Sequence, residues 1–168
     1  MTLRVRRLEP GDDRSAFRCG NPDLDRFVAQ YAGQNQFRHH LGTTYVAVEG
    51  YVIAGFATMT ASEILPAAMP TKSKKRLPRH PLPVLRLARL AVDEQARGQG
   101  VGGALMLATF AVARQMADNL GCIGILVDAK PEAVAFYRRF GFEAVDIVAG
   151  LLGDRPQPLP MFIELAQF

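Results

Sequence analysis

The sequence contains no apolar run long enough to cross a membrane, and residues 1–7 lack the apolar segment that a signal peptide needs. Cysteine is scarce, because the chain has only Cys19 and Cys122, and neither has a partner spacing typical of a zinc site. The three histidines form no metal-ligand spacing with a cysteine or carboxylate pair, so we assign no metal. Internal repeats and low-complexity tracts are also missing. We therefore expect a cytoplasmic protein without a metal centre.

The 168 residues, 49% of them hydrophobic, fit one domain over residues 1–168 with an ample core. The net charge is +4, and the basic residues are concentrated in a proline-rich stretch, residues 66–83, and in the segment after it. They are Lys72, Lys74, Lys75, Arg76, Arg79, His80, Arg86 and Arg89. A solvated basic loop and a contact surface for a polyanion such as RNA both explain this pattern, so both interpretations stay open.

A glycine-rich turn over residues 97–102, Arg-Gly-Gln-Gly-Val-Gly, lies between a strand-like stretch at residues 85–92 and a helix-like stretch at residues 101–120. Glycines let the backbone approach an anion closely, and the N–H groups at a helix N-terminus supply donors and a partial positive charge. The turn therefore predicts a site for the phosphates of a nucleotide-like cofactor. An ordinary loop at the start of a helix is the alternative interpretation.

The identity of the cofactor depends on where this turn lies in the chain. Gly98, Gly100 and Gly103 satisfy the dinucleotide pattern G-x-G-x-x-G, and Asp128 lies about where a ribose-binding acid is expected. A dinucleotide fold, however, places this turn after its first strand and needs several more parallel units, whereas only about 65 residues follow here. Arg97 has no role in the dinucleotide pattern, but it suits a cofactor with a diphosphate and an additional phosphate. We therefore favour coenzyme A, and we expect Asp128 to orient the turn that follows it.

Hydrophobic periodicity predicts an α+β fold with a mixed sheet. The first part of the chain is predicted to form a strand, a helix capped near residues 21–23 and an antiparallel hairpin, at residues 3–8, 24–31, 43–48 and 52–59. After the proline-rich stretch the order becomes strand, helix, strand, helix, strand, at residues 85–92, 101–120, 123–127, 132–140 and 161–165. The continuous apolar run at residues 123–127 is typical of a buried parallel strand, here beside residues 87–92.

A mixed sheet with a basic glycine turn after its fourth strand, followed by Ala-x-x-Phe-Tyr-Arg-Arg-Phe-Gly-Phe over residues 133–142, resembles the GNAT superfamily of acyl-CoA-dependent N-acetyltransferases. The run Arg-x-x-Gly-x-Gly over residues 97–102 matches the cofactor motif of that superfamily, and the Phe-Tyr-x-x-Phe-Gly-Phe ending matches its C-terminal half. The resemblance covers nearly the whole chain. It implies a GNAT fold, with a twisted, mixed antiparallel and parallel sheet that is flanked by helices and splayed at the fourth and fifth strands.

The resemblance also implies acetyl-CoA as co-substrate, with its pyrophosphate on the N–H groups of residues 97–102 and its pantetheine arm along the strand that ends at Val92. An amide N–H near residues 90–92 would face the thioester oxygen and stabilise the charge that develops there. The expected cofactor-binding residues are Leu90, Ala91, Val92, Arg97, Gly98, Gln99, Gly100, Val101, Gly102, Gly103 and Phe136.

Two further segments narrow the resemblance. Residues 17–27 and residues 80–93 are similar to the tRNA-acetylating toxins of type II toxin-antitoxin systems, whose known members acetylate the amino group of aminoacyl-tRNA and stop translation. This similarity implies a ribbon-helix-helix antitoxin as partner and a homodimer. It also implies that basic residues contact tRNA, namely Lys72, Lys74, Lys75, Arg76, Arg79, Arg86 and Arg89.

Acetyl transfer needs a neutral amine and a proton for the departing thiolate. Tyr137 has the position of the proton donor in the family, and a phenol with an ordinary pKa near 10 is protonated at neutral pH, so we expect Tyr137 to be the general acid. An aromatic core residue is the alternative, because Phe136 and Phe140 beside it have that character. Glu63 and Asp93 are candidate general bases, although we expect both to face solvent.

Two other functions are compatible with parts of this pattern. A GNAT acetyltransferase that acts on a small amine or a protein amine would explain the glycine turn and Tyr137, but it leaves the basic stretch unexplained. A non-catalytic nucleic-acid or partner-binding module on the same scaffold is disfavoured, because Arg97, Gly100, Gly102 and Tyr137 are all intact. We therefore expect an acetyl-CoA-dependent toxin that modifies aminoacyl-tRNA.

Overall fold

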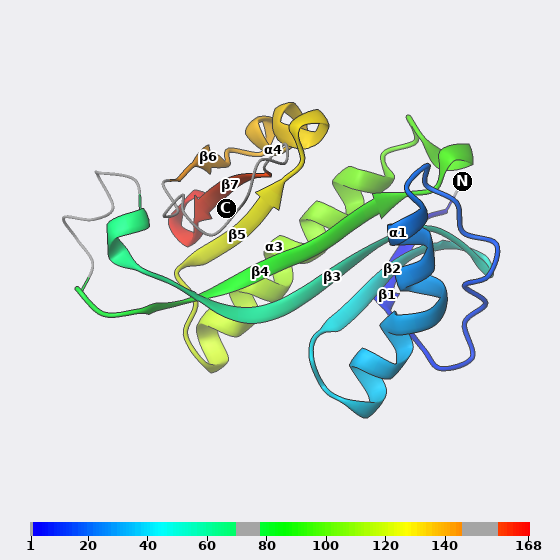
Figure 1. The fold of residues 1–168 in the computed structure, drawn as a ribbon, viewed down its shortest axis with the longest axis horizontal. Coiled ribbons are helices and arrows are strands. Elements are labelled where there is room, and N and C mark those ends of the chain that lie inside the picture. Colours follow the sequence, from blue (N-terminus) through cyan, green and yellow to red (C-terminus); the bar gives the residue numbers. More distant parts are fainter. Residues whose placement is uncertain (1, 70–77, 146–157) are drawn as a thin grey trace. The chain divides into compact units, whose positions relative to one another are not determined.

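The computed structural model describes residues 2–69, 78–145 and 158–168 (Figure 1). Its strands are β1 (Arg4–Arg7), β2 (Thr43–Glu49), β3 (Val52–Ile64), β4 (Leu82–Val92), β5 (Gly124–Ala129), β6 (Glu143–Ala144) and β7 (Leu159–Glu164). Its α-helices are α1 (Pro22–Arg26), α3 (Val101–Asn119) and α4 (Val134–Arg139). The shorter helical turns are η1 (Phe27–Tyr31), η2 (Gln34–Arg38), η3 (Pro66–Ala68), η4 (Glu94–Ala96), η5 (Pro131–Ala133) and η6 (Leu165–Gln167). No helix in the described parts of the chain is long and apolar enough to span a membrane.

The described strands form one sheet in the order β1-β2-β3-β4-β5-β7-β6. Antiparallel pairs join β1 to β2, β2 to β3, β5 to β7 and β6 to β7. The neighbours β4 and β5 pair in parallel, because α3 connects them. The mixed sheet that the sequence predicted is therefore confirmed, and so is the position of the glycine turn after its fourth strand.

The hairpin of β2 and β3 forms where the alternating pattern predicts it. Val46 is paired with Phe56, and a bulge between Ala47 and Val48 shifts the register near the turn. Gly50 has a φ of +62° in that turn, a conformation that glycine adopts without strain.

Close contacts divide the chain into two compact units. The first consists of Met1–Thr60 and Leu87–Ala111, and the second of Ala61–Arg86 and Val112–Phe168. Each unit has its own cluster of buried apolar side chains. The glycine turn and the adjoining end of β4 belong to the first unit, whereas Tyr137 belongs to the second.

Successive residues of β3 point to opposite faces of the sheet in the first unit. On one face Phe56 packs against Phe17 and Phe27, with ring centroids 5.3 and 6.1 Å apart. On the other face a Cβ at Gly55 would lie 2.7 Å from Cγ1 of Val101, so glycine is what allows the start of α3 to approach β3 so closely. The sheet thus positions the N-terminus of α3 directly.

The helix α1 begins at the predicted cap, because Oδ1 of Asn21 accepts hydrogen bonds from the N–H groups of Asp23 and Leu24. It continues through the π-helical turns η1 and η2, beyond the end predicted at Tyr31. The turn η2 buries no residue, so its sequence carries no apolar periodicity by which the extension could be predicted.

In the second unit β5 and β7 pair very closely. A Cβ at Gly124 would lie 2.1 Å from the carbonyl oxygen of Ile163 and 2.5 Å from the ring of Phe162, so the pairing requires glycine. The helix α4 ends at Arg139, and Gly141, two residues later, has a φ of +99° in the left-handed region that favours glycine. The two-residue strand β6 follows and pairs with β7, an element that the sequence pattern did not predict.

Candidate active site

The glycine turn predicted to bind phosphate opens α3 in the first unit. Gly98 and Gly100 have φ values of +76° and +81°, and a Cβ at either position would meet nothing within 4 Å. Both glycines are therefore required by the backbone conformation, and the space beside them is open. The N–H groups of residues 101–103 precede the hydrogen bond from Ala104 to the carbonyl of Gly100, and the first turn of α3 has no acidic residue. This arrangement can bind an anion through backbone donors and the helix dipole.

The guanidinium of Arg97 has a partner within the protein. Its Nη2 donates a hydrogen bond to the carbonyl of Cys19 at 2.8 Å, and Gly20, with a φ of +92°, lies against the side chains of Arg97 and Glu94. Arg97 therefore ties the glycine turn to the segment before α1. This contact could not be predicted from the sequence, because the two residues are 78 positions apart and no local pattern connects them.

Asp93 connects the same two segments. Its Oδ2 accepts a hydrogen bond from the N–H of Arg18 at 3.0 Å, and its Oδ1 accepts one from the N–H of Gln95 at 2.9 Å. The N–H of Glu94 donates to the carbonyl of Arg18 at 2.8 Å. The carboxylate of Asp93, a candidate general base, thus accepts hydrogen bonds from backbone N–H groups in the segments that lead to the glycine turn. Glu63, the other candidate base, is exposed.

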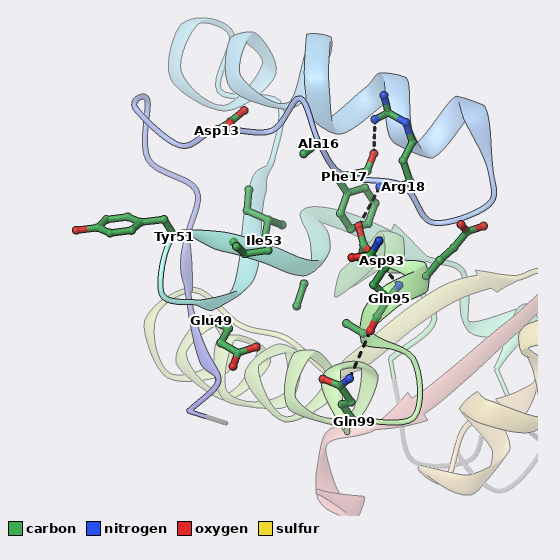
Figure 2. A pocket seen from close by; sticks show the side chains of 14 residues that line it. Asp13, Ala16, Phe17, Arg18, Glu49, Tyr51, Ile53, Asp93, Gln95 and Gln99 are labelled. Atoms are coloured by element: carbon green, nitrogen blue, oxygen red, sulfur yellow. Dashed lines mark hydrogen bonds between the residues drawn. The ribbon is translucent and has the colours of Figure 1, made fainter.

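A groove of about 620 Å³ borders these segments (Figure 2). Its walls come from the loop before α1, the tip of the β2–β3 hairpin and η4, and Tyr51 at that tip projects outward and is 98% exposed. The lining carboxylates are Asp13, Glu49, Asp93 and Glu94. Like charges repel, so this acidic lining disfavours the phosphates of a cofactor, and the donors of the glycine turn are the better place for them.

The strand end expected to hold the pantetheine arm lies in the same unit as the glycine turn. Leu90 and Val92 are half-buried, whereas Ala91 between them is buried in the cluster that contains Phe27. The N–H of Asp93 then bonds to the carbonyl of Ala54 in β3 at 2.8 Å, which holds the end of β4 in the sheet. The first unit therefore brings together all the predicted cofactor residues except Phe136.

Tyr137 is the buried residue of α4, with 5% of its surface exposed. Its ring packs edge-on against Phe136 and Phe142, at centroid distances of 5.3 and 5.4 Å. Burial raises the pKa of Tyr137 to about 12. The phenol is therefore protonated at neutral pH, where it can donate a hydrogen bond but cannot act as a base.

The hydroxyl of Tyr137 reaches a surface although its ring is buried. It makes no hydrogen bond to a described residue, yet none of the fully buried side-chain oxygens of the described residues lacks a partner. The oxygen is therefore not fully enclosed. Phe136 beside it is half-buried and packs edge-on against Phe140, with ring centroids 5.1 Å apart. Tyr137 therefore also belongs to an aromatic cluster, as the alternative interpretation of the sequence expects.

The predicted tRNA-contact residues have different surroundings. Arg79 is exposed, and Arg86 forms an ion pair with Asp128 that offsets its charge. Arg89 is half-buried, with its guanidinium 3.7 Å from the centroid of the Phe27 ring. The other predicted contacts, Lys72, Lys74, Lys75 and Arg76, lie outside the described residues.

Comparison with known proteins connects the chain to a family. The family model of the acetyltransferase (GNAT) domain matches residues 40–144. A curated protein named tRNA-acetylating toxin, from Mycobacterium tuberculosis (strain ATCC 25618 / H37Rv), is 34% identical over 139 residues, which cover 82% of this chain and 82% of that protein. The resemblance to tRNA-acetylating toxins is therefore confirmed as a likeness.

Solved structures share the fold. AtaT complexed with acetyl-methionyl-tRNAfMet superposes with a TM-score of 0.85 at 24% identity, over 98% of this chain and 96% of that one. AtaTR bound with AcCoA superposes with a TM-score of 0.76 at 26% identity, over 98% of this chain and 94% of that one. Because the GNAT model matches more than half of its residues, this chain belongs to the GNAT acetyltransferase family and is an acetyl-CoA-dependent N-acetyltransferase.

Proposed function

We propose that this acetyltransferase is a toxin that acetylates the α-amino group of aminoacyl-tRNA and so blocks translation. The observation that carries the proposal is the open glycine turn, free of acidic residues, in a chain 34% identical to a tRNA-acetylating toxin. A shared fold with AtaT complexed with acetyl-methionyl-tRNAfMet supports it. The proposed partners are the charged tRNA, a cognate ribbon-helix-helix antitoxin and a second copy of the chain in a homodimer.

Acetyl-CoA binds in this proposal with its pyrophosphate on the N–H groups of residues 97–102 and its pantetheine arm along Leu90–Val92. Because the Arg97 guanidinium bonds to the carbonyl of Cys19, backbone donors take the phosphates while Arg97 holds the turn in shape. A backbone N–H near Leu90–Val92 faces the thioester oxygen and stabilises its developing charge. Phe136 packs against the cofactor.

The amine nitrogen attacks the thioester carbon, the carbon–sulfur bond breaks, and the proton lost by the nitrogen balances the one gained by the thiolate. Tyr137 donates a hydrogen bond to the departing thiolate, since its raised pKa of about 12 keeps the phenol protonated. An α-amino group with a pKa of about 7.7 to 8.0 is about 9 to 17% neutral at pH 7, whereas a lysine is only about 0.04% neutral. An aminoacyl ester therefore needs no strong general base. This agrees with the hydrogen bonds that Asp93 accepts from two backbone N–H groups.

The basic residues bind the phosphates of the tRNA in this proposal. Arg79 and Arg89 carry charges that no described carboxylate offsets, whereas Asp128 reduces the contribution of Arg86. Lys72, Lys74, Lys75 and Arg76 remain tRNA contacts predicted from the sequence. Each neutralised phosphate releases counterions, so we expect the affinity for tRNA to fall steeply with salt concentration.

The deciding experiment incubates the protein with labelled acetyl-CoA and total charged tRNA, with discharged tRNA as the matched control. We expect label on charged tRNA only, and mild base, which cleaves the aminoacyl ester, should release it together with the amino acid. Absence of label from both RNA samples would overturn the tRNA proposal. Label on added polyamines or protein amines in the same reaction would then assign the enzyme a different acceptor.

A further inference from the structure

Arg89 in β4 is a half-buried cation that forms no ion pair with an acidic side chain of the described residues. Its guanidinium lies 3.7 Å from the centroid of the Phe27 ring, and no carboxylate of the described residues forms an ion pair with it. Burial lowers the pKa of Arg89 below its ordinary value, as expected for a cation partly removed from water. The face of the guanidinium is occupied by the ring, so its N–H edges are what remain for a ligand.

A small cavity of about 130 Å³ opens beside this guanidinium within the first unit. Its walls include Asn35, Thr58 and Ala88, and none of the described residues that line it is acidic. The hydroxyls of Thr58 and Thr44 bond to each other at 2.8 Å, so they partner one another in the wall. Pockets that enclose a whole small molecule measure about 300 Å³ or more. This cavity therefore admits one small group and not a nucleoside.

An oxyanion fits these observations. A guanidinium presents paired N–H donors at the spacing of two phosphate or carboxylate oxygens, and the stacking on Phe27 fixes the plane in which those donors point. The amide of Asn35 supplies a further neutral donor in the wall. None of the described residues that line the cavity carries a negative charge that would repel an anion there.

The cavity lies close to the strand end assigned to the thioester. Arg89 and Ala91 face the same side of β4, and a strand rises about 3.3 Å per residue, so Arg89 lies within about 10 Å of the backbone at Leu90–Val92. The phosphates of the cofactor are assigned to the glycine turn. An oxyanion at Arg89 therefore belongs to the acceptor.

We propose that Arg89 and this cavity form an oxyanion subsite that holds a backbone phosphate of the acceptor tRNA and so positions its aminoacyl end. The inference rests on the tRNA acetylation proposed above and adds a defined contact to it. A carboxylate of a small acceptor would accept hydrogen bonds from the Arg89 guanidinium in the same way. The net charge of +4, with its basic residues concentrated in the sequence that leads into the same strand, favours a polyanion and therefore the phosphate.

The kinetic test compares Arg89→Lys with the matched control Arg4→Lys, which alters an exposed arginine of β1. Lysine keeps the charge but loses the paired donors and the flat stacking surface. We expect Arg89→Lys to raise KM for charged tRNA about tenfold, the effect of losing one charge-assisted hydrogen bond, with KM for acetyl-CoA unchanged. The Arg4→Lys variant should change neither value by more than about twofold. Equal tRNA kinetics for the two variants would overturn the subsite.

A binding test that needs no acetyl transfer separates the subsite from the proposed function. The anisotropy of a fluorescent RNA tetranucleotide is titrated with wild-type protein and with both variants, and inorganic phosphate or acetate is then added as competitor. We expect Arg89→Lys alone to weaken binding, and phosphate to compete better than acetate. Stronger competition by acetate would assign the cavity to a carboxylate and refute the phosphate proposal. Arg89-dependent RNA binding without labelling of charged tRNA would retain the subsite and reject the proposed reaction.

Discussion

Replacement of Tyr137 by phenylalanine tests the proton donor with little disturbance of the fold. The ring is 5% exposed and packs edge-on against Phe136 and Phe142, contacts that phenylalanine retains. The hydroxyl makes no hydrogen bond to a described residue, so its removal leaves none of the described residues without a partner. We expect the free energy of unfolding to change by less than about 1 kcal/mol.

The expected loss of activity is far larger. Burial raises the pKa of Tyr137 to about 12, so at pH 7 only about one molecule in 10⁵ carries the phenolate and nearly all can donate. Donation by a positioned acid contributes about 10²- to 10⁴-fold to a rate. We therefore expect Tyr137→Phe to lower kcat about 10²- to 10³-fold, with KM for acetyl-CoA within about twofold of wild type.

The assay measures single-turnover acetylation of charged tRNA between pH 6 and pH 9. The wild-type rate should rise with pH as the acceptor amine loses its proton and then level off, because Tyr137 keeps its proton until the pH approaches about 12. The variant should show the same profile at a lower rate. Tyr45→Phe, at a half-buried tyrosine of β2, is the matched control and should keep the wild-type rate.

Two results would refute this reasoning. A Tyr137→Phe rate within threefold of wild type would remove the hydroxyl from the chemistry. A wild-type profile with a falling limb below pH 9 that disappears in Tyr137→Phe would show that the phenol loses its proton far below the value that its burial predicts.

Three further predictions follow from the packing and hydrogen bonds. Asp93→Ala removes the acceptor for two backbone N–H groups, so we expect KM for acetyl-CoA to rise about three- to tenfold. The value is measured by isotope incorporation, and an unchanged KM would contradict a role of Asp93 in shaping the glycine turn. Arg6 donates two hydrogen bonds to Asp12 and so lowers the pKa of that carboxyl. The contribution of this ion pair to the stability of the fold is complete above the ordinary carboxyl pKa near 3.9, and it is lost as the pH falls through the lowered pKa. Asp12→Asn should therefore cost about 1 to 2 kcal/mol at pH 7, and its difference from wild type in urea unfolding should shrink on acidification, whereas a difference independent of pH would contradict the ion pair. Gly124→Ala should lower the free energy of unfolding by about 3 kcal/mol or more, because the new Cβ would lie 2.1 Å from a backbone carbonyl oxygen, whereas the control Gly11→Ala meets nothing within 4 Å and should be nearly neutral.

Elements with a local sequence pattern were predicted well. The alternating β-branched stretches around Gly50 predicted the β2–β3 hairpin, and the cap at Asn21 predicted the start of α1. The turn η2 and the strand β6 were not predicted. The first buries no side chain, and the second is two residues long and depends on its pairing with β7, so neither carries a local pattern.

The candidate site divides in the same way. The glycine turn before α3 and the aromatic run around Tyr137 could be identified from consecutive residues, because backbone dihedral preferences and apolar periodicity act over short distances. The partners of Arg97, Asp93 and Arg89 could not, since each contacts a segment more than sixty positions away in the sequence.

The sequence by itself determined the order of the elements, the glycine-dependent turn at the start of α3 and the membership of an acetyltransferase family. Only the tertiary structure decided that Arg97 bonds to the carbonyl of Cys19, that Asp93 serves backbone donors and that Arg89 lies over Phe27. The physical reason is that sheet register and burial determine which distant residues a side chain contacts. Both depend on the packing of the whole chain and not on the residues beside it.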